Sequence, residues 1–110
     1  MGEYIQVFTA TEKREDAERI AKTLVGRRIA GCVQIVGPIT SIYWWKGEME
    51  KAEEWLCLIK SKKNLYKELE KSIKEAHPYE TPEIIVLPIV EGSRDYLEWL
   101  GGELGKKKTI

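Results

Sequence analysis

The segment from His77 to Glu83 holds the most concentrated set of side chains that could bind a metal ion. It reads His-Pro-Tyr-Glu-Thr-Pro-Glu, a loop stiffened by two prolines that presents one imidazole, one phenol and two carboxylates. Imidazole is a good ligand for copper, zinc and nickel, but a useful site normally needs two or more protein ligands. The residues alone favour a second interpretation, in which His77 caps the carbonyls at a helix C-terminus and interacts with the helix dipole.

Other arrangements that carry catalysis are missing from the sequence. The chain has one histidine in 110 residues, so a multi-histidine zinc site or a Ser-His-Asp array has little support. No serine stands in a nucleophile elbow and no GxGxxG occurs. The final GGELGKKKT lacks the spacing of a phosphate-binding loop. The sequence therefore does not predict an enzyme, and it requires no cofactor.

Composition predicts one globular domain over residues 1–110. Apolar residues make up 43% of the chain, and 18 Lys and Arg balance 18 Asp and Glu. A net charge of zero argues against nucleic acid and membrane surfaces as partners, since both usually select a basic excess. The longest apolar runs, such as Ile84 to Val90, fall far short of the roughly 18 residues that cross a bilayer. The N-terminus resembles no secretory signal, so we expect a cytoplasmic protein.

The first half of the chain predicts a strand, a helix and a long hairpin. A strand over Tyr4–Thr9 leads into a helix that ends near Gly26, with Thr9 and Glu12 at capping-box spacing. Ile29 to Trp45 indicates a very long strand, interrupted at Gly37-Pro38. Lys46-Gly47-Glu48 reverses the chain, and Glu54 to Ser61 is the predicted returning strand. Cys32 and Cys57 each stand inside an apolar run, which is typical of buried, reduced thiols.

The second half predicts a helix, a strand and a shorter helix. A helix from Asn64 ends before His77-Pro78, because the residue before proline avoids the helical region. Ile84 to Val90 is the fourth strand, and Ser93 caps a last helix that Gly101-Gly102 ends after Leu100. Residues from about 103 to 110 are predicted to fray. Lys60 and Lys62 follow the third strand, either as a solvated strand end or as contacts to an anionic ligand.

The order β-α-β-β-α-β with a C-terminal helix predicts an α+β fold of the ferredoxin-like, split βαβ type. Its second and fourth strands are the sheet edges, where the two strand prolines fall. Apolar edges need cover, and aromatic residues such as Tyr43, Trp44 and Trp45 lie on the protruding arm. These aromatics either fill the monomer core or, as we expect, build a homo-oligomer through edge pairing and arm exchange.

Several distinctive blocks follow one another from Val7 to Leu100: a first strand ending in Thr-Ala, then RRIAGCVQI, ITSIYWWKGEME, LIKSKKNL, HPYETPEIIVLPI and YLEWL. In sequence and order these blocks resemble the CutA family, the divalent cation tolerance proteins. The resemblance implies a tight, cytoplasmic homotrimer similar in architecture to the PII signalling proteins, a long hairpin that wraps neighbouring subunits, and a link to divalent-metal tolerance and copper. It implies no established enzymatic reaction.

The resemblance leaves two functions open. In the first, His77 ligates Cu(II) or another divalent cation together with Glu80 or a symmetry-related group. The other two ligands suggested for bacterial relatives are replaced here by Phe8 and Ala76. In the second, an unidentified small ligand sits in a cleft between subunits, as in a PII-like signalling or assembly module. The residues expected to line that cleft are Tyr43, Trp45, Lys60, Tyr79 and Glu80.

Overall fold

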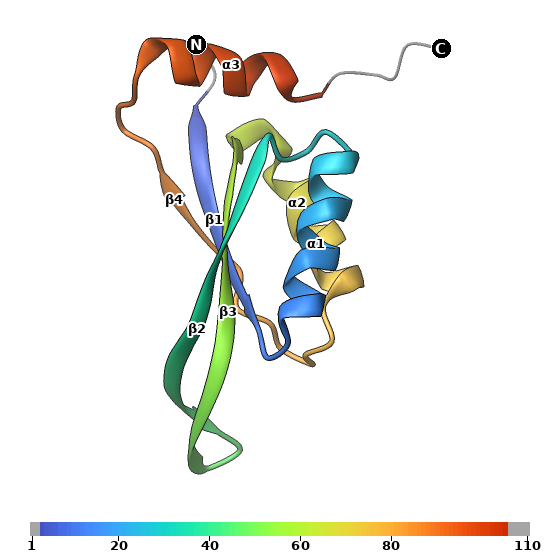
Figure 1. The fold of residues 1–110 in the computed structure, drawn as a ribbon, viewed down its shortest axis with the longest axis vertical. Coiled ribbons are helices and arrows are strands. Elements are labelled where there is room, and N and C mark those ends of the chain that lie inside the picture. The colour runs from blue at the N-terminus through green and yellow to red at the C-terminus, as the bar shows by residue number, and fades with distance from the viewer. Residues whose placement is uncertain (1–2, 106–110) are drawn as a thin grey trace.

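A computed structural model describes residues 3–105 as four strands and three α-helices (Figure 1). In chain order the elements are β1 (Tyr4–Thr11), α1 (Arg14–Gly26), β2 (Cys32–Trp45), β3 (Glu48–Lys62), the 3₁₀ turn η1 (Lys63–Leu65), α2 (Tyr66–Ala76), β4 (Ile85–Pro88) and α3 (Arg94–Glu103). This is the predicted order of strands and helices.

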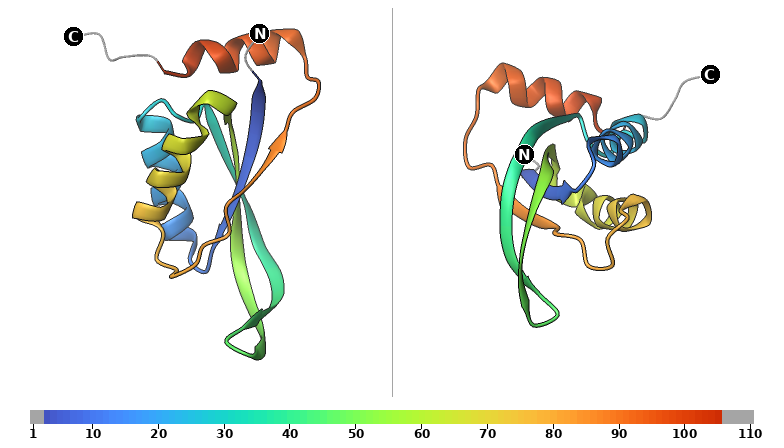
Figure 2. Two further views of the ribbon diagram at one scale, coloured as in Figure 1. Left: turned by 180° about the vertical axis from the view of Figure 1, so that it is seen from behind. Right: turned by 60° about the horizontal axis from the view of Figure 1, so that its bottom comes forward.

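The strands form one antiparallel sheet in the order β2-β3-β1-β4, which confirms β2 and β4 as its edges. Both α1 and α2 cover the same face of the sheet (Figures 1 and 2). The core between them is built from alternate strand residues and one stripe of each helix. Its fully buried members include Val7, Ile59, Ile20, Leu24 and Leu69.

The β2-β3 hairpin extends well past the ends of the two helices (Figure 1). Lys46 and Gly47 form its two-residue turn, with φ of 51° and 84°, and Trp45 pairs with Glu48 across it. Positive φ at both turn positions is the geometry that matches the twist of paired strands. The register shifts between Val36 and Ile39, so the interruption predicted at Gly37-Pro38 is an irregularity in an edge strand.

The face of the sheet opposite α1 and α2 is largely apolar and uncovered along its middle. Strand register places Phe8, Leu58 and Ile85 side by side on this face, beside Leu87 and Val36. Ile85 and Leu87 are 50% and 51% exposed. The third helix, α3, crosses only one end of the sheet (Figure 2). Residues 3–105 therefore leave an apolar sheet face and an aromatic arm without cover.

Several predicted boundaries were wrong. Thr9 and Thr11 belong to β1, and α1 has Lys13 as its N-cap without a side-chain cap, so the capping box does not form. β3 begins at Glu48, six residues before the predicted start, because Glu48 to Glu53 pair with β2 along the arm. β2 begins at Cys32 and β4 covers only Ile85–Pro88, since Ile29, Ala30 and Ile89 lie outside the ladder.

The C-terminal helix starts as predicted and ends later. Ser93 Oγ accepts a hydrogen bond from the Tyr96 N–H, which confirms the cap. Gly101 and Gly102 remain helical, and Arg28 Nη1 contacts Glu103 Oε1 at 2.7 Å. The Gly105 N–H then donates to the Arg28 carbonyl at 2.8 Å. Residues 103–105 are therefore docked rather than frayed, and the rest of the predicted tail, 106–110, lies outside the described residues.

Candidate functional site

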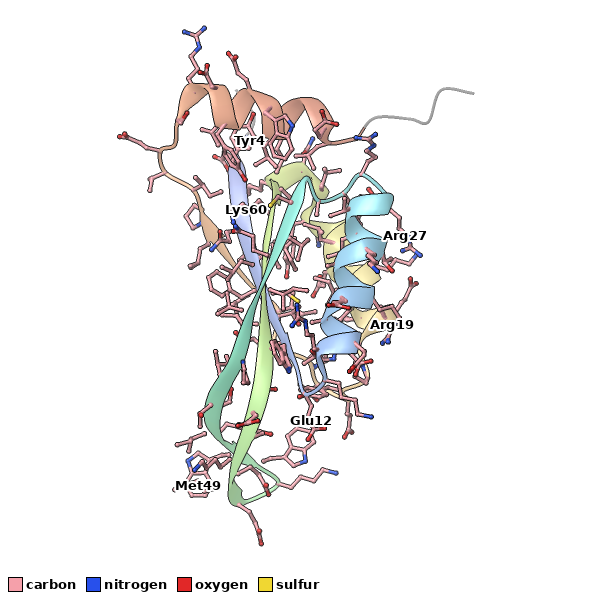
Figure 3. All side chains as sticks on the ribbon, in the orientation of Figure 1. Tyr4, Glu12, Arg19, Arg27, Met49 and Lys60 are labelled. Carbon is pink, nitrogen blue, oxygen red and sulfur yellow. The ribbon has the colours of Figure 1, made fainter. Side chains whose placement is uncertain are left out.

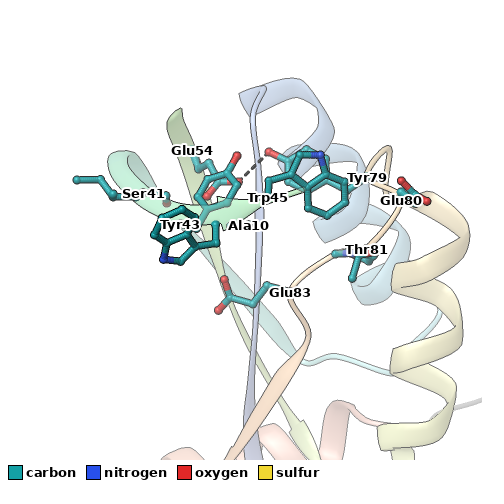
Figure 4. A pocket seen from close by; sticks show the side chains of 12 residues that line it. Ala10, Ser41, Tyr43, Trp45, Glu54, Tyr79, Glu80, Thr81 and Glu83 are labelled. Carbon is teal, nitrogen blue, oxygen red and sulfur yellow. Dashed lines mark hydrogen bonds between the residues drawn. The ribbon is translucent and has the colours of Figure 1, made fainter. Parts of the chain in front are cut away.

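An open cleft of about 800 Å³ lies where the hairpin, the end of β1 and the loop after α2 meet (Figure 4). The hairpin contributes aromatic and apolar side chains and one carboxylate, and the loop contributes Tyr79 and two more carboxylates. The lining residues are Ala10, Ser41, Ile42, Tyr43, Trp44, Trp45, Glu54, Tyr79, Glu80, Thr81, Pro82 and Glu83. The cleft is thus aromatic and acidic.

Glu54 and Tyr79 join the two walls of this cleft. The Tyr79 hydroxyl donates a hydrogen bond of 2.7 Å to Glu54 Oε2 (Figure 4). Glu54 is only 7% exposed, an unusual position for a carboxylate. Burial and the bonded Glu54 carboxylate both raise the pKa of Tyr79, so its hydroxyl stays protonated and remains a donor. This bond fixes the loop against the base of the arm.

His77 lies beside the cleft, with both ring nitrogens bonded to the backbone. Nε2 is 2.8 Å from the Ala10 carbonyl oxygen, and Nδ1 is 3.1 Å from the Tyr79 N–H. Because a carbonyl can only accept, Nε2 carries the proton and Nδ1 accepts from Tyr79. The imidazole therefore joins β1 to the loop. Its bond goes to β1, so the predicted capping of the α2 carbonyls was wrong; Arg19 Nη2 donates to the Ala76 carbonyl at 2.8 Å instead.

The surroundings of His77 favour the neutral ring. Burial lowers the pKa of His77 from its ordinary value of 6.5, and nearby Arg19 lowers it further. The bond to Ala10 and the charges of Asp16 and Glu54 act in the opposite direction but do not outweigh burial. Neutral imidazole is the form that ligates metals. However, a metal at either nitrogen would have to displace one of the two backbone hydrogen bonds.

Lys46 reaches back from the hairpin turn to the rim of the cleft. Its ammonium nitrogen lies 5.4 Å from the centre of the Trp45 ring and 3.9 Å from Glu80 Oε1. The Lys46 and Glu80 side chains are 72% and 73% exposed, so their ion pair is weak. The arrangement nevertheless places an ammonium between an aromatic ring and a carboxylate.

The structure brings most of the predicted site residues together. Tyr43, Trp45, Tyr79 and Glu80 line the cleft, with His77 behind Tyr79 at a ring-centroid distance of 4.6 Å. Lys60 does not line this cleft within one subunit, and its assignment to a cleft between subunits stays a prediction. It lies toward the other end of β3 from the hairpin tip at Met49 (Figure 3), hydrogen-bonded to Gln34 Oε1.

Sequence reasoning missed Glu54 and Lys46 as parts of this site. Glu54 stands at the first position of the predicted returning strand, where a polar residue attracts no attention, and Lys46 was assigned only to the turn. Pairing across the two-residue turn places Glu54 opposite Ile39 at the base of the arm. No signal in the sequence places it near the loop after α2.

Two kinds of feature are absent from the described residues. Among residues 3–105, no group of three or more His, Cys, Asp or Glu side chains is arranged to hold a metal ion. Over the same range, no helix is both long and apolar enough to cross a membrane. Cys32 and Cys57 are free thiols, as predicted; Cys57 is buried, and burial raises its pKa to about 11. Cys32 is only half-buried.

These features describe a small α+β protein with an acidic, aromatic cleft beneath a long hairpin. The family model described as CutA1 divalent ion tolerance protein matches residues 5–103. The chain is also 44% identical over 99 residues to the divalent-cation tolerance protein CutA of Thermus thermophilus, covering 90% of this chain and 96% of that protein. The chain belongs to the CutA1 divalent ion tolerance protein family.

Other relatives are longer, and solved structures share the fold. Human protein CutA is 37% identical over 90% of this chain, which spans about half (55%) of that protein's length. The Thermus thermophilus structure matches with a TM-score of 0.90 at 43% identity, covering 93% of this chain and 99% of that one. CutA1 from Oryza sativa matches with a TM-score of 0.92 at 35% identity, covering 96% and 97%. An Archaeoglobus fulgidus relative is described as a periplasmic divalent cation tolerance protein.

Proposed function

We propose that this protein acts in the cellular response to divalent metal ions as a cytoplasmic homotrimer that binds Cu(II) or another divalent cation. The observation that carries the proposal is the acidic cleft beside His77, in a chain of the divalent ion tolerance family. Within this proposal the strand order β2-β3-β1-β4 is ferredoxin-like and the assembly is PII-like.

The uncovered apolar surfaces support the trimer. Ile42, Trp44 and Met49 on the arm are 65%, 70% and 65% exposed, and the sheet face opposite the helices carries further apolar side chains. A monomer with this much exposed apolar surface would be prone to aggregate. Packing the arm of one subunit against the sheet of the next covers both surfaces. Light scattering on the purified protein should return three times the 12.7 kDa chain mass, and a monomer at micromolar concentration would refute the assembly.

The cleft carboxylates support a cation site that a second subunit completes. Glu80 is exposed and forms only a long ion pair with Lys46, whereas His77 must first release one backbone hydrogen bond. No three-ligand group lies within the described part of one chain, so a neighbouring subunit or water must supply the remaining ligands. Imidazole and carboxylate together suit copper or zinc.

Calorimetric titration with Cu(II) and Zn(II) tests this site. His77→Ala and Glu80→Gln should each weaken binding about tenfold or more relative to wild type, whereas Glu15→Gln on α1 provides a matched control that should bind normally. Binding should also weaken when the pH falls from 7 to 5.5, because protonated imidazole does not ligate. Equal binding by wild type and both cleft variants would show that the metal does not bind at this site.

The aromatic lining supports a second candidate function, binding of a small molecule. Tyr43, Trp45 and Tyr79 surround a cleft whose volume of about 800 Å³ far exceeds that of a metal ion. Cavities of this size and composition hold small organic ligands in many proteins. In this function the trimer is a signalling or assembly module and metal tolerance is indirect. A panel of organic ligands titrated without metal would separate it from the first candidate.

A further inference from the structure

We infer that Lys60 and Lys62 form an anion site at the α3 end of the sheet, and that its ligand is a phosphate group, either free or as a monoester. Lys60 and Tyr4 both lie toward this end of the sheet, far from the hairpin tip at Met49 (Figure 3). Within one subunit the site shares no residue with the cleft beneath the hairpin. The inference therefore goes beyond the cation and small-molecule functions proposed above and does not rest on either.

Lys60 and Lys62 are the lysines of residues 3–105 that folding draws partly out of water. Both are half-buried, whereas every other lysine in this range is exposed. They alternate with Ile59 and Ser61, whose side chains are fully buried on the helix side of β3. Lys60 and Lys62 therefore share the opposite face, with Cα atoms about 7 Å apart, because a strand rises about 3.3 Å per residue.

Neither lysine has a carboxylate partner within residues 3–105. Lys60 Nζ donates to the side-chain oxygen of Gln34, and Lys62 Nζ lies 5.2 Å from the centre of the Tyr4 ring. By contrast, every arginine in the same range forms an ion pair with a carboxylate. Two like charges on one face repel each other, and a partly buried charge without a counter-charge costs free energy. An anion bound between the two ammonium groups would relieve both costs.

The neighbouring strands place neutral hydrogen-bond donors around the two ammonium groups. The register sets Gln6 directly opposite Lys60 and Tyr4 directly opposite Lys62, so these side chains share one face. Gln34 on β2 already contacts Lys60 and brings a second amide. Each ammonium carries three donors, each amide two and the phenol one. The cluster thus combines two positive charges with neutral donors and contains no acidic side chain.

Gly101 in α3 sets the position of Tyr4 and Lys62. A Cβ atom at Gly101 would stand 2.5 Å from the Tyr4 hydroxyl oxygen and 3.3 Å from Lys62 Nζ. The hydroxyl and the ammonium therefore converge against the α3 backbone, in space that only glycine leaves open. Donors that are already held in place lose less entropy when a ligand binds.

This arrangement suits a small anion with two charges. A phosphate dianion can accept from both ammonium groups and from an amide at the same time, whereas a carboxylate carries one charge and two oxygens. A nucleic acid would need a wide basic surface. The chain as a whole has no net charge, and the cluster is confined to one end of a sheet face. A single phosphate group matches its size and charge.

Titration followed by amide NMR tests the site on the purified protein. The probes are inorganic phosphate, methyl phosphate and acetate at pH 7.5 and matched ionic strength. Amides around Lys60 and Gln6 should show saturable shifts with phosphate, which should bind about tenfold more tightly than acetate and weaken with added sodium chloride. If only inorganic phosphate binds, the ligand is the free ion; if methyl phosphate binds as well, the site also accepts monoesters.

Matched lysine variants locate the charges that bind. Lys60→Gln and Lys62→Gln should each weaken phosphate binding about fivefold or more. Lys71→Gln on α2 removes the same charge from an exposed lysine and should bind normally. Phosphate should also raise the melting temperature of wild type and Lys71→Gln more than that of the other two variants. Lys60→Met replaces Lys60→Gln if that variant does not fold.

A competing explanation is that a carboxylate of a neighbouring subunit pairs with these lysines. Lys60→Gln and Lys62→Gln would then dissociate the assembly in light scattering, wild type would not bind phosphate, and the inference would be overturned. Equal binding of acetate and phosphate, or unchanged phosphate binding in both lysine variants, would also overturn it. Cu(II) titration of Lys60→Gln reads the proposed cation site separately, so failure of one site is distinguishable from failure of the other.

Discussion

The Tyr79 hydroxyl and the Glu54 carboxylate form a hydrogen bond of 2.7 Å that joins the loop after α2 to the base of the hairpin arm. The two residues are 25 positions apart in the chain, yet this bond places the loop carboxylates opposite the hairpin aromatics. Ala10, at the end of β1, contacts the same region through the His77 ring. The shape of the cleft therefore depends on two polar contacts between its walls.

Tyr79→Phe should destabilise the protein by about 1–3 kcal/mol, because it leaves a buried carboxylate without its donor. Urea unfolding at a fixed protein concentration measures the change. Tyr43→Phe is the control, since the Tyr43 hydroxyl makes no hydrogen bond within the described residues, and it should shift the free energy of unfolding by less than about 0.5 kcal/mol. Similar losses in the two variants would show that the Glu54 contact contributes nothing specific.

The His77 ring should make stability depend on pH. Burial lowers the folded-state pKa of His77 below its ordinary value of 6.5, so the unfolded chain binds a proton more readily than the folded chain. The stabilisation is fully present above pH 6.5 and is lost as the pH falls toward the folded-state pKa. Protonation of Nδ1 would also turn the acceptor for the Tyr79 N–H into a donor.

His77→Gln separates this effect from other titrations. The glutamine amide can donate to the Ala10 carbonyl and accept from Tyr79, but it does not titrate. Between pH 7.5 and 5.5 the free energy of unfolding should therefore fall more steeply for wild type than for the variant. If the free energy of unfolding changed with pH equally in the two proteins, protonation of His77 would not affect stability in this range.

Much of the fold could be predicted because, in each element that packs on the core, the apolar residues recur at the spacing of a strand or a helix. Ile20 and Leu24 in α1 and Leu69 and Ile73 in α2 mark the buried stripes, and Pro38 and Pro88 mark edge strands. Apolar residues do not alternate in this way from Glu48 to Glu53, because these strand residues face no core within their own subunit. The returning strand was therefore predicted to start six residues too late.

The candidate site was predicted only in part, because its residues come from three separate elements. The loop motif identified His77, Tyr79 and Glu80, and their chemistry was visible from residue type alone. The hydrogen bonds that determine how these residues act were not visible from the sequence. Nothing in the sequence indicates that Ala10 accepts from His77, or that Glu54 meets Tyr79, because both contacts depend on strand register and on the angle at which the loop leaves α2.

Trp45→Ala should weaken the proposed trimer more than it perturbs the isolated subunit. Trp45 is 39% exposed in one subunit and lies on the arm, so its ring is available to a neighbour. Truncation of a buried interface tryptophan costs about 2 kcal/mol or more of association energy. Light scattering over a dilution series should detect dissociation of the variant, with Lys22→Ala on α1 as control. A variant that remains trimeric at high dilution, with an unchanged melting temperature, would assign Trp45 to the subunit core.

Gly37→Ala should destabilise the hairpin at its register shift. A Cβ atom at Gly37 would stand 2.4 Å and 2.7 Å from two atoms of the Trp55 indole, closer than van der Waals contact allows. Trp55 cannot retreat freely, because it packs against the core and Arg14 covers its ring at 5.2 Å. Forcing a methyl group into such a packed position typically costs about 1–3 kcal/mol.

Gly26→Ala is the matched control for Gly37→Ala. Its Cβ would meet no atom within 4 Å, and Gly26 lies in the last turn of α1 with an ordinary helical backbone. Alanine loses less backbone entropy than glycine on folding, so the free energy of unfolding should stay the same or rise by up to about 1 kcal/mol. Thermal and urea unfolding of both variants measure the contrast. If Gly37→Ala were as stable as Gly26→Ala, Trp55 would have to be mobile, and the base of the arm would be a hinge rather than a fixed support for the cleft.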